Sequence, residues 1–440
     1  MSLALGNGLA RASVRARPSA FGGVFAVFVL SSTVVTSSVA VWRTASAVPD
    51  GALSTDRREA LTSMGAGFTL VTVYLSFFVI GQVMGLAVAQ RARENALLRA
   101  VGALPWQLRR MVAVEALLTA LPALPVGYVL GRWLAGVWCE GMAGQGLLPR
   151  GVELRVGWPP LLVSAAVLVV TSQIGGVIAA HRAARARPSA ALGEAASGGR
   201  AGLGPVRAVG AVLALGGAAA LTAATLSAPA DEAAEHLPLV LLAYLVAVGL
   251  AGPALGRLAA GVFGLLLRAL GDRAEGELAV SHARAHTRRL SSAIAPVALM
   301  VAFSLVKFAA MAGQDGDPSW IDLYATALYA GFAALVTVNT MVMLTAERGR
   351  EIALLRAVGT SPGQILRALS LEALVVTAAG LASGSLIALT LDRTLGTATS
   401  FALSSLPPTT WPALSTATAL LILTSTLTPM PWLLRRGTSG

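Results

Sequence analysis

The segment Glu94-Asn95-Ala96-Leu97-Leu98-Arg99-Ala100-Val101-Gly102 returns later in the chain as Glu351-Ile352-Ala353-Leu354-Leu355-Arg356-Ala357-Val358-Gly359. The offset is constant (351 − 94 = 257) and also relates Arg93 to Arg350. Each copy is a charged stretch between two long apolar runs. The two halves of the chain therefore carry the same charged element in equivalent places.

The composition is that of a membrane protein. Of 440 residues, 55% are hydrophobic and 12% are charged, and the mean hydropathy is +0.73. A soluble domain has about twice this charged fraction. The apolar residues form continuous blocks of roughly 20, long enough to cross a hydrocarbon core of about 30 Å as helices. The sequence thus predicts an all-α integral membrane protein.

Ten apolar blocks predict about ten transmembrane helices. Two four-helix units, 1–190 and 275–440, flank a centre (191–274) made of a cytoplasmic linker and two helices. The predicted spans are 20–42, 66–90, 112–138, 159–180, 206–226, 237–258, 291–311, 323–346, 371–391 and 410–434. The sixth block continues to Leu270, and we interpret its tail as an interfacial helix after a break at Gly252-Pro253, with a further span as the alternative.

The arginines predict the orientation in the membrane. Basic loops alternate along the chain with acidic or mixed loops, and both repeated segments fall in basic loops. The positive-inside rule then places these loops and both termini in the cytoplasm. The net charge of +12 is spread over six loops rather than gathered on one face, so we expect no nucleic-acid partner.

The sequence offers no site for chemistry. A single cysteine, Cys139, excludes an internal disulfide and a multi-cysteine metal site. His282 and His286 have the spacing of two ligands on one helix face, but no acidic residue or cysteine completes a set. Lys307 lacks the glycine-rich loop of a nucleotide site, so we expect neither ATP hydrolysis nor a cofactor in this chain.

Acidic residues are absent from the middle of every predicted span, which disfavours an ion-coupled carrier. Glu115 and Glu372 occupy equivalent repeat positions within about one helical turn of the cytoplasmic boundary. There they are expected to cap helix ends or to pair with Arg110 and Arg367.

Each repeated segment predicts a short amphipathic helix. Its apolar residues, spaced i, i+1 and i+4, form one stripe, and arginines surround it. The stripes are Leu97, Leu98 and Val101, and Leu354, Leu355 and Val358, with Arg93, Arg99, Arg350 and Arg356 around them. Gly102 and Gly359 suit a helix C-cap, and the prolines that follow, Pro105 and Pro362, prevent a continuous helix into the next span. Such a helix either rests on lipid head groups or enters a groove on a cytoplasmic partner.

Two further matched pairs fall inside the predicted spans. Gln82 matches Asn339, and because an unpaired amide is costly in lipid, each should face another helix or a cavity. They are candidates to face each other between the two halves. Gly127 matches Gly384, and both belong to small-xxx-small patterns that favour close helix contact.

The repeated segment resembles the E-I-x-x-L-R-A-x-G signature of FtsX-like (MacB-type) ABC transporter permeases. Residues 182–192 are similar to the R-x-x-P-x-x-A-L ending of a four-span unit of that family. The resemblance implies a permease subunit in a bacterial plasma membrane, working with a separate ATPase dimer on the inner face. It assigns the ATPase contact to residues 91–107 and 348–364, which include Glu94 and Glu351. It leaves open a homodimer or a single pseudo-symmetric permease.

The chain also departs from that family. Its first outer loops, 43–65 and 312–322, are too short for the usual extracytoplasmic domain, since a folded domain needs at least about 50 residues. Asn95 replaces the usual isoleucine in the first copy. The resemblance favours export or extraction of an amphipathic, lipid-like, peptide or antibiotic cargo. The alternative is a signalling subunit that transmits the state of the ATPase without moving cargo.

Overall fold

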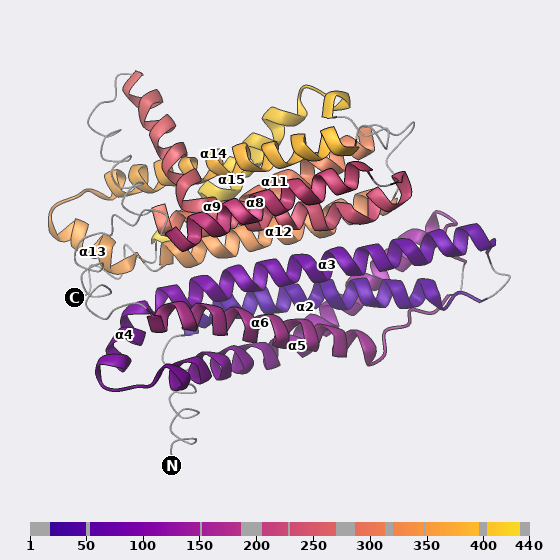
Figure 1. Ribbon diagram of the computed structural model, residues 1–440, viewed down its shortest axis with the longest axis horizontal. Coiled ribbons are helices and arrows are strands. Elements are labelled where there is room, and N and C mark those ends of the chain that lie inside the picture. Colours follow the sequence, from indigo (N-terminus) through magenta and orange to yellow (C-terminus); the bar gives the residue numbers. More distant parts are fainter. Residues whose placement is uncertain are drawn as a thin grey trace, which may run out of the picture. The chain divides into compact units, whose positions relative to one another are not determined.

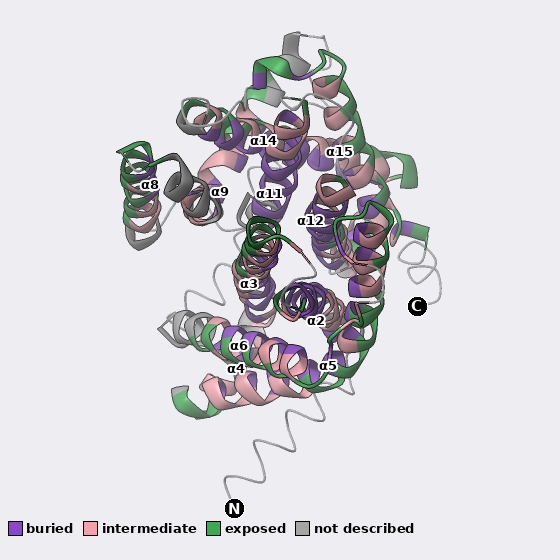
Figure 2. Ribbon diagram, turned by 90° about the vertical axis from the view of Figure 1, so that its right-hand side faces the viewer, coloured by how far each residue is buried: buried purple, intermediate pink, exposed green. Residues whose placement is uncertain are grey.

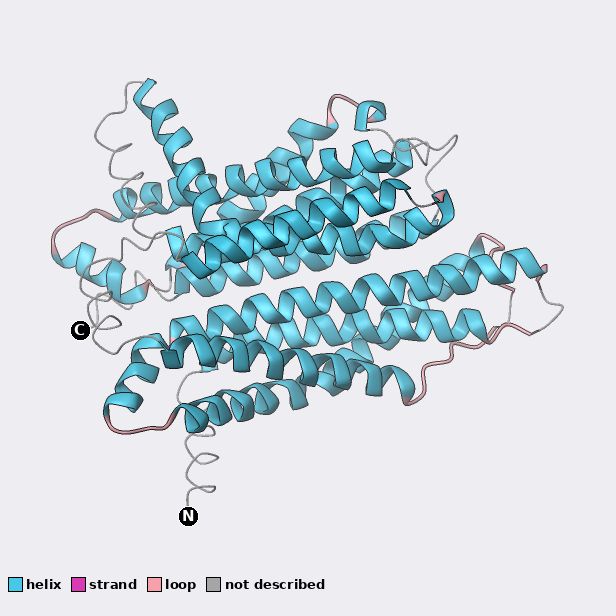
Figure 3. Cartoon of the chain, in the orientation of Figure 1, coloured by secondary structure: helices cyan, strands magenta, loops and turns pink. Residues whose placement is uncertain are grey.

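The computed structural model describes residues 18–49, 53–149, 152–185, 205–227, 229–269, 287–312, 320–346, 348–395 and 403–431. Within these ranges the chain is helical and has no strand (Figure 3). The helices, labelled in Figure 1, are α2 (Pro18–Ser46), α3 (Thr55–Gln90), α4 (Ala92–Ala100), α5 (Pro105–Gly144), α6 (Pro159–Arg185), α8 (Pro205–Ser227), α9 (Ala230–Ala269), α11 (Thr287–Ala312), α12 (Trp320–Ala346), α13 (Gly349–Ala357), α14 (Pro362–Leu395) and α15 (Thr410–Leu427), with a short 3₁₀ helix, η1 (Leu403–Ser405).

Nine of the described helices are long and apolar enough to cross a membrane: α2, α3, α5, α6, α8, α9, α11, α12 and α14. They coincide with the first nine predicted spans, which confirms a multi-span, all-α membrane protein. The tenth predicted span corresponds to α15, which has only 18 residues and is rich in serine and threonine. Several of these hydroxyls bond their own helix, as Thr418 Oγ1 does to the Leu414 carbonyl.

The expected break at Gly252-Pro253 is wrong, because α9 continues through it as one helix of 40 residues. Such a helix is about 60 Å long, twice the thickness of the hydrocarbon core, so it extends well beyond a span. Proline removes one backbone hydrogen bond, but neighbouring helices sustain such a segment in a membrane protein. Here α9 packs against α8, α11 and α14.

The chain divides into two compact units. The first comprises Met1–Ser197 with Ser319–Tyr324, and the second comprises Gly198–Pro318 with Ala325–Gly440. Helices α2 to α6 thus belong to the first unit, while α8 and α9, the described part of the predicted centre, belong to the second.

Helix α2 forms the core of the first unit and contacts α3, α5 and α6 (Figure 2). Its buried face combines valine with hydroxyl side chains that bond across helices. Thr36 and Ser164 hydroxyls lie 2.8 Å apart, as do those of Ser38 and Thr72. These bonds satisfy polar groups that would otherwise be costly in an apolar environment.

The two matched glycines lie at close helix contacts. A Cβ atom on Gly127 of α5 would lie 2.6 Å from Ser32 Oγ of α2. In the second unit, a Cβ on Gly384 of α14 would lie 2.7 Å from Val301 Cβ of α11. Neither position has room for a side chain, so α5 packs directly on α2, and α14 on α11.

Candidate functional site

Helices α4 and α13 form short connections between consecutive long helices, α3 to α5 and α12 to α14, and have nine residues each (Figure 1). Both end in the same hydrogen-bonded turn. Gly102 N–H donates to the Arg99 carbonyl (3.0 Å) and Ala103 N–H to the Leu98 carbonyl (2.9 Å). The equivalent bonds of Gly359 and Thr360 are both 3.0 Å long. This pattern is a Schellman motif.

Glycine is required at the end of each short helix. Gly102 and Gly359 have φ values of 102° and 96°, in the left-handed region that other residues rarely adopt. The predicted capped helices are therefore present in both units.

A glutamine caps the long helix that follows each turn. Gln107 Oε1 accepts a hydrogen bond from Leu104 N–H, and Gln364 Oε1 accepts one from Ser361 N–H, both 2.9 Å long. Ser361 also returns the bond, since its Oγ accepts from Gln364 N–H at 3.3 Å. The prolines at 105 and 362 begin these helices without losing an internal bond. Each short helix is thus fixed at its far end by a closed turn.

The predicted apolar stripe divides into two faces. Leu97 and Val101 are 51% and 89% exposed, and Leu354 and Val358 are 68% and 86% exposed. Val101 and Val358 are the two most exposed large apolar side chains among the described residues. Leu98 and Leu355 are half-buried and form the inward face.

The charged residues of the two short helices are half-buried where they are described: Glu94, Arg99, Glu351 and Arg356. The side chains of Arg93 and Arg350 lie outside the described residues.

A buried ion pair ties the start of each short helix to the next long helix. Arg91 Nη1 lies 2.6 Å from Glu115 Oε2, and Arg348 Nη1 contacts Glu372 Oε2 in the same way. The side chains are 14% and 6% exposed in the first pair, and 8% and 5% in the second. The expected pairing of these glutamates with Arg110 and Arg367 is therefore wrong. Arg110 and Glu115 are five residues apart on α5, about 1.4 turns, so they point to different sides of that helix. Arg91 lies between α3 and α4 and reaches Glu115 from there.

Sequence reasoning missed Arg91 and Arg348 as partners, and the repeat could not single them out. Both members of each pair obey the same offset (348 − 91 = 257 and 372 − 115 = 257). Arg110 and Arg367 obey that offset as well (367 − 110 = 257), so only the three-dimensional contact identifies the partner of each glutamate.

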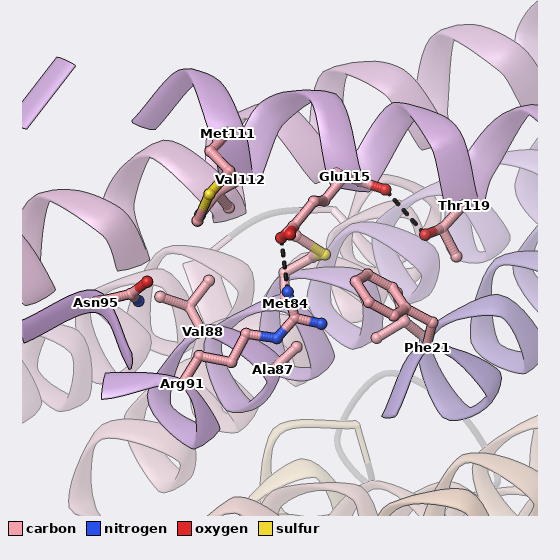
Figure 4. Close-up of a pocket in the computed structure, with 12 residues that line it drawn as sticks. Phe21, Met84, Ala87, Val88, Arg91, Asn95, Met111, Val112, Glu115 and Thr119 are labelled. Atoms are coloured by element: carbon pink, nitrogen blue, oxygen red, sulfur yellow. Dashed lines mark hydrogen bonds and ion pairs between the residues drawn. The ribbon is translucent and has the colours of Figure 1, made fainter. Parts of the chain in front are cut away.

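The first ion pair lies in a small cavity of about 30 Å³ between α2, α3, α4 and α5 (Figure 4). The Arg91 guanidinium stacks over the Phe21 ring, with Cζ 4.2 Å from its centroid, so the beginning of α2 lies at the same end as α4. Asn95 also lines the cavity and is 3% exposed. Beneath α4, a buried amide thus accompanies the ion pair.

The second ion pair lines an equivalent cavity of about 20 Å³. Ile352, the repeat equivalent of Asn95, is not among the residues that line this cavity and joins a buried apolar cluster with Ile365, Leu369 and Met430. Leu355 and Leu427 pack against this cluster, which brings the end of α15 to the same end as α13. Beneath α13, a buried isoleucine thus stands where α4 has a buried amide.

The two predicted intramembrane amides lie in the last third of their helices. Gln82 in α3 and Asn339 in α12 are both half-buried, and Asn339 Nδ2 contacts Met343 Sδ at 3.7 Å. Their facing each other stays a prediction.

Among the described residues, no group of three or more histidine, cysteine, aspartate or glutamate side chains is arranged to hold a metal ion. His282, His286 and most of segment 182–192 lie outside the described residues.

Comparison with known proteins agrees with this arrangement. The family described as FtsX-like permease C-terminal matches residues 66–188 and 325–439, more than half of the chain, and each match runs through one short helix. No curated protein matches the chain. The paired match to both halves shows that the chain belongs to the FtsX-like permease family, whose members are membrane subunits rather than enzymes by themselves.

Proposed function

We propose that this chain is the permease subunit of an ABC transporter and that α4 and α13 are its coupling helices to a separate ATPase dimer. The observation that carries the proposal is the pair of exposed apolar residues on each short helix: Leu97 with Val101, and Leu354 with Val358. Two apolar side chains one turn apart on a short helix are the usual anchors of a helix that enters a groove on a partner. Members of the FtsX-like permease family typically work with such an ATPase.

The anchoring of each coupling helix supports a mechanical role. The first helix is held at its start by the Arg91–Glu115 pair and at its end by the turn at Gly102. A movement of α4 is therefore passed to both α3 and α5, rather than absorbed in a loose loop. The same contacts in the second unit couple α13 to α12 and α14. Closure of the ATPase dimer would thereby shift the helices that flank each coupling helix.

The same contacts support the proposed orientation of the chain in the membrane. The beginning of α2 lies beside Arg91, and the end of α15 packs against the apolar cluster beneath α13. Both ends of the described chain thus lie on the coupling-helix side of their own units. Together with the arginine-rich loops, this supports a cytoplasmic location of both termini in a bacterial plasma membrane.

We assign the cargo to amphipathic molecules, such as a lipid, a lipoprotein, a hydrophobic peptide or an antibiotic, and the direction to export or extraction. The short outer connections support this assignment, because α3 begins at Thr55 and α12 at Trp320 and leave little sequence for an outer domain. We also propose that the chain consists of two four-helix permease units, 1–190 and 275–440, on either side of the centre 191–274.

The test removes the apolar anchors. Leu97→Asp combined with Leu354→Asp should leave the permease inserted in the membrane but abolish retention of the ATPase and permease-dependent ATP hydrolysis. The matched control, Leu97→Met with Leu354→Met, keeps apolar surface and should behave as the unmodified protein. Undiminished ATPase retention by the aspartate variant would refute the assignment. Movement of a fluorescent lipid or peptide in ATP-loaded proteoliposomes separates a transporter from a signalling subunit, which would hydrolyse ATP without moving either.

A further inference from the structure

The turns that follow the two coupling helices differ in apolar surface. Leu104 and Trp106 stand where the second copy has Ser361 and Gly363 (361 − 104 = 257 and 363 − 106 = 257). Leu104 is 51% and Trp106 is 46% exposed. We define the first tip as Leu97, Val101, Leu104 and Trp106, and the second tip as Leu354, Val358, Ser361 and Gly363. The first tip thus carries four large apolar side chains, and the second carries two.

The first tip is a fixed surface. Val101 and Leu104 stand on either side of the Schellman turn, whose closing bond joins Ala103 N–H to the Leu98 carbonyl at 2.9 Å. Leu104 N–H is held by Gln107 Oε1 at the start of α5. The backbone that presents the four side chains is therefore ordered before any partner binds, which lowers the entropic cost of association.

The position of the first tip favours a protein over the bilayer as its occupant. Arg109 and Arg110 follow Trp106 along α5, toward the membrane-spanning part of that helix. Such arginines mark the level of the lipid head groups. All four residues of the tip precede these arginines in the chain, and two of them, Leu97 and Val101, are the exposed pair of the proposed ATPase surface.

We propose that the first coupling helix is the principal anchor of the ATPase, with Trp106 and Leu104 inserted in a pocket of that protein, and that the second is the weaker contact. This inference rests on the proposed function. Tryptophan is strongly enriched among the residues that dominate interface affinity, whereas a serine and a glycine add little apolar contact. The two ATPase subunits are therefore held unequally by the two halves of one permease chain.

The experiment exchanges the tips. The permease is reconstituted in lipid nanodiscs, and the dissociation constant of the ATPase that co-purifies with the unmodified permease is measured. Leu104→Ser with Trp106→Ala should weaken binding at least tenfold, which corresponds to about 1.4 kcal/mol. Ser361→Leu with Gly363→Trp should leave binding unchanged or strengthen it. The structure accommodates this reciprocal variant, since the nearest atom to a Cβ on Gly363 is Ser361 Oγ at 4.0 Å.

The outcomes separate this inference from the proposed function. In one outcome, Leu97→Asp with Leu354→Asp abolishes binding, but Leu104→Ser with Trp106→Ala does not weaken it. The assignment of α4 and α13 as coupling helices then holds, and the unequal anchoring is wrong. If neither variant weakens binding, both proposals fail. As a control, each variant must give the same size-exclusion profile as the unmodified protein, which shows that its fold is retained.

A labelling measurement tests the bilayer as the alternative occupant. Cys139→Ala removes the single cysteine of the chain, so Leu104→Cys in that background is uniquely labelled. A water-soluble maleimide should label it in nanodiscs and fail to do so once the ATPase is bound. Protection in nanodiscs without the ATPase, compared with detergent, would place the first tip in lipid and overturn the inference.

Discussion

The buried ion pairs give the sharpest test of how the coupling helices are held. Replacing Glu115 by glutamine removes one charge of the first pair and leaves the Arg91 guanidinium in its cavity. Replacing Glu372 by glutamine does the same to Arg348 in the second unit. Because the pair joins the end of α3 to α5, the substitution acts on the anchorage of α4 without touching its exposed face.

The magnitude follows from distance and burial. The 2.6 Å contact between Arg91 and Glu115 places the charge centres about 4 Å apart, where the attraction is about 4 kcal/mol at an effective dielectric constant of about 20. Removing one partner of a buried pair costs about 3–5 kcal/mol, because the remaining charge stays desolvated. Arg91 is 14% exposed and Arg348 only 8%, so we expect the lower end of this range for Glu115→Gln and the upper end for Glu372→Gln.

The assay is the free energy of unfolding in lipid–detergent micelles, followed by tryptophan fluorescence during denaturation. Replacing both partners with apolar residues, Arg91→Met with Glu115→Leu, should recover stability to within about 1 kcal/mol of the unmodified protein, because no lone charge remains. Arg110→Gln is the matched control, since Arg110 is not the partner of Glu115 in the structure, and should cost less than about 1 kcal/mol.

Two results would refute this reasoning. The first is an equal loss from Glu115→Gln and Arg110→Gln, which would mean that the pairing seen in the structure does not hold the helix ends together. The second is a double variant whose loss equals the sum of its two single losses, which would show that the two side chains do not interact.

The remaining predictions concern packing, turns and the difference between Asn95 and Ile352. Gly384→Val should destabilise the protein by at least about 1–3 kcal/mol through overpacking against α11, measured by thermal unfolding, whereas Gly136→Ala, where a Cβ meets nothing within 4 Å, should have little effect. Gly102→Ala, at φ 102°, should cost about 1 kcal/mol and increase amide hydrogen exchange in α4; unchanged exchange would argue against the turn. Asn95→Ile should slow hydrogen exchange in α4 by giving it the buried isoleucine of α13, and Ile352→Asn should accelerate it in α13; the opposite signs would contradict the comparison of the two positions.

The positions of most helices could be predicted because a membrane imposes a simple rule. A continuous apolar block must become a helix of spanning length, so the first nine predicted spans match described helices. The rule fails where local signals compete with packing. Gly252-Pro253 predicts a break, but contacts of α9 with α8, α11 and α14 keep that helix continuous.

The repeat by itself determined the family resemblance, the two short helices, their glycine turns and the contact glycines Gly127 and Gly384, because each depends on local backbone geometry or on the offset of 257 residues (359 − 102 = 257). Only the tertiary structure decided which charges pair, since a side chain reaches across a turn to a helix that sequence distance does not identify. It also decided which leucines face outward, because Leu98 and Leu355 turn inward only when a neighbouring helix offers a surface. The surroundings of Asn95 and Ile352 became visible for the same reason. Asn95 lies in a cavity lined by side chains from α2 and α5, whereas Ile352 packs in an apolar cluster with side chains from α14 and the segment after α15.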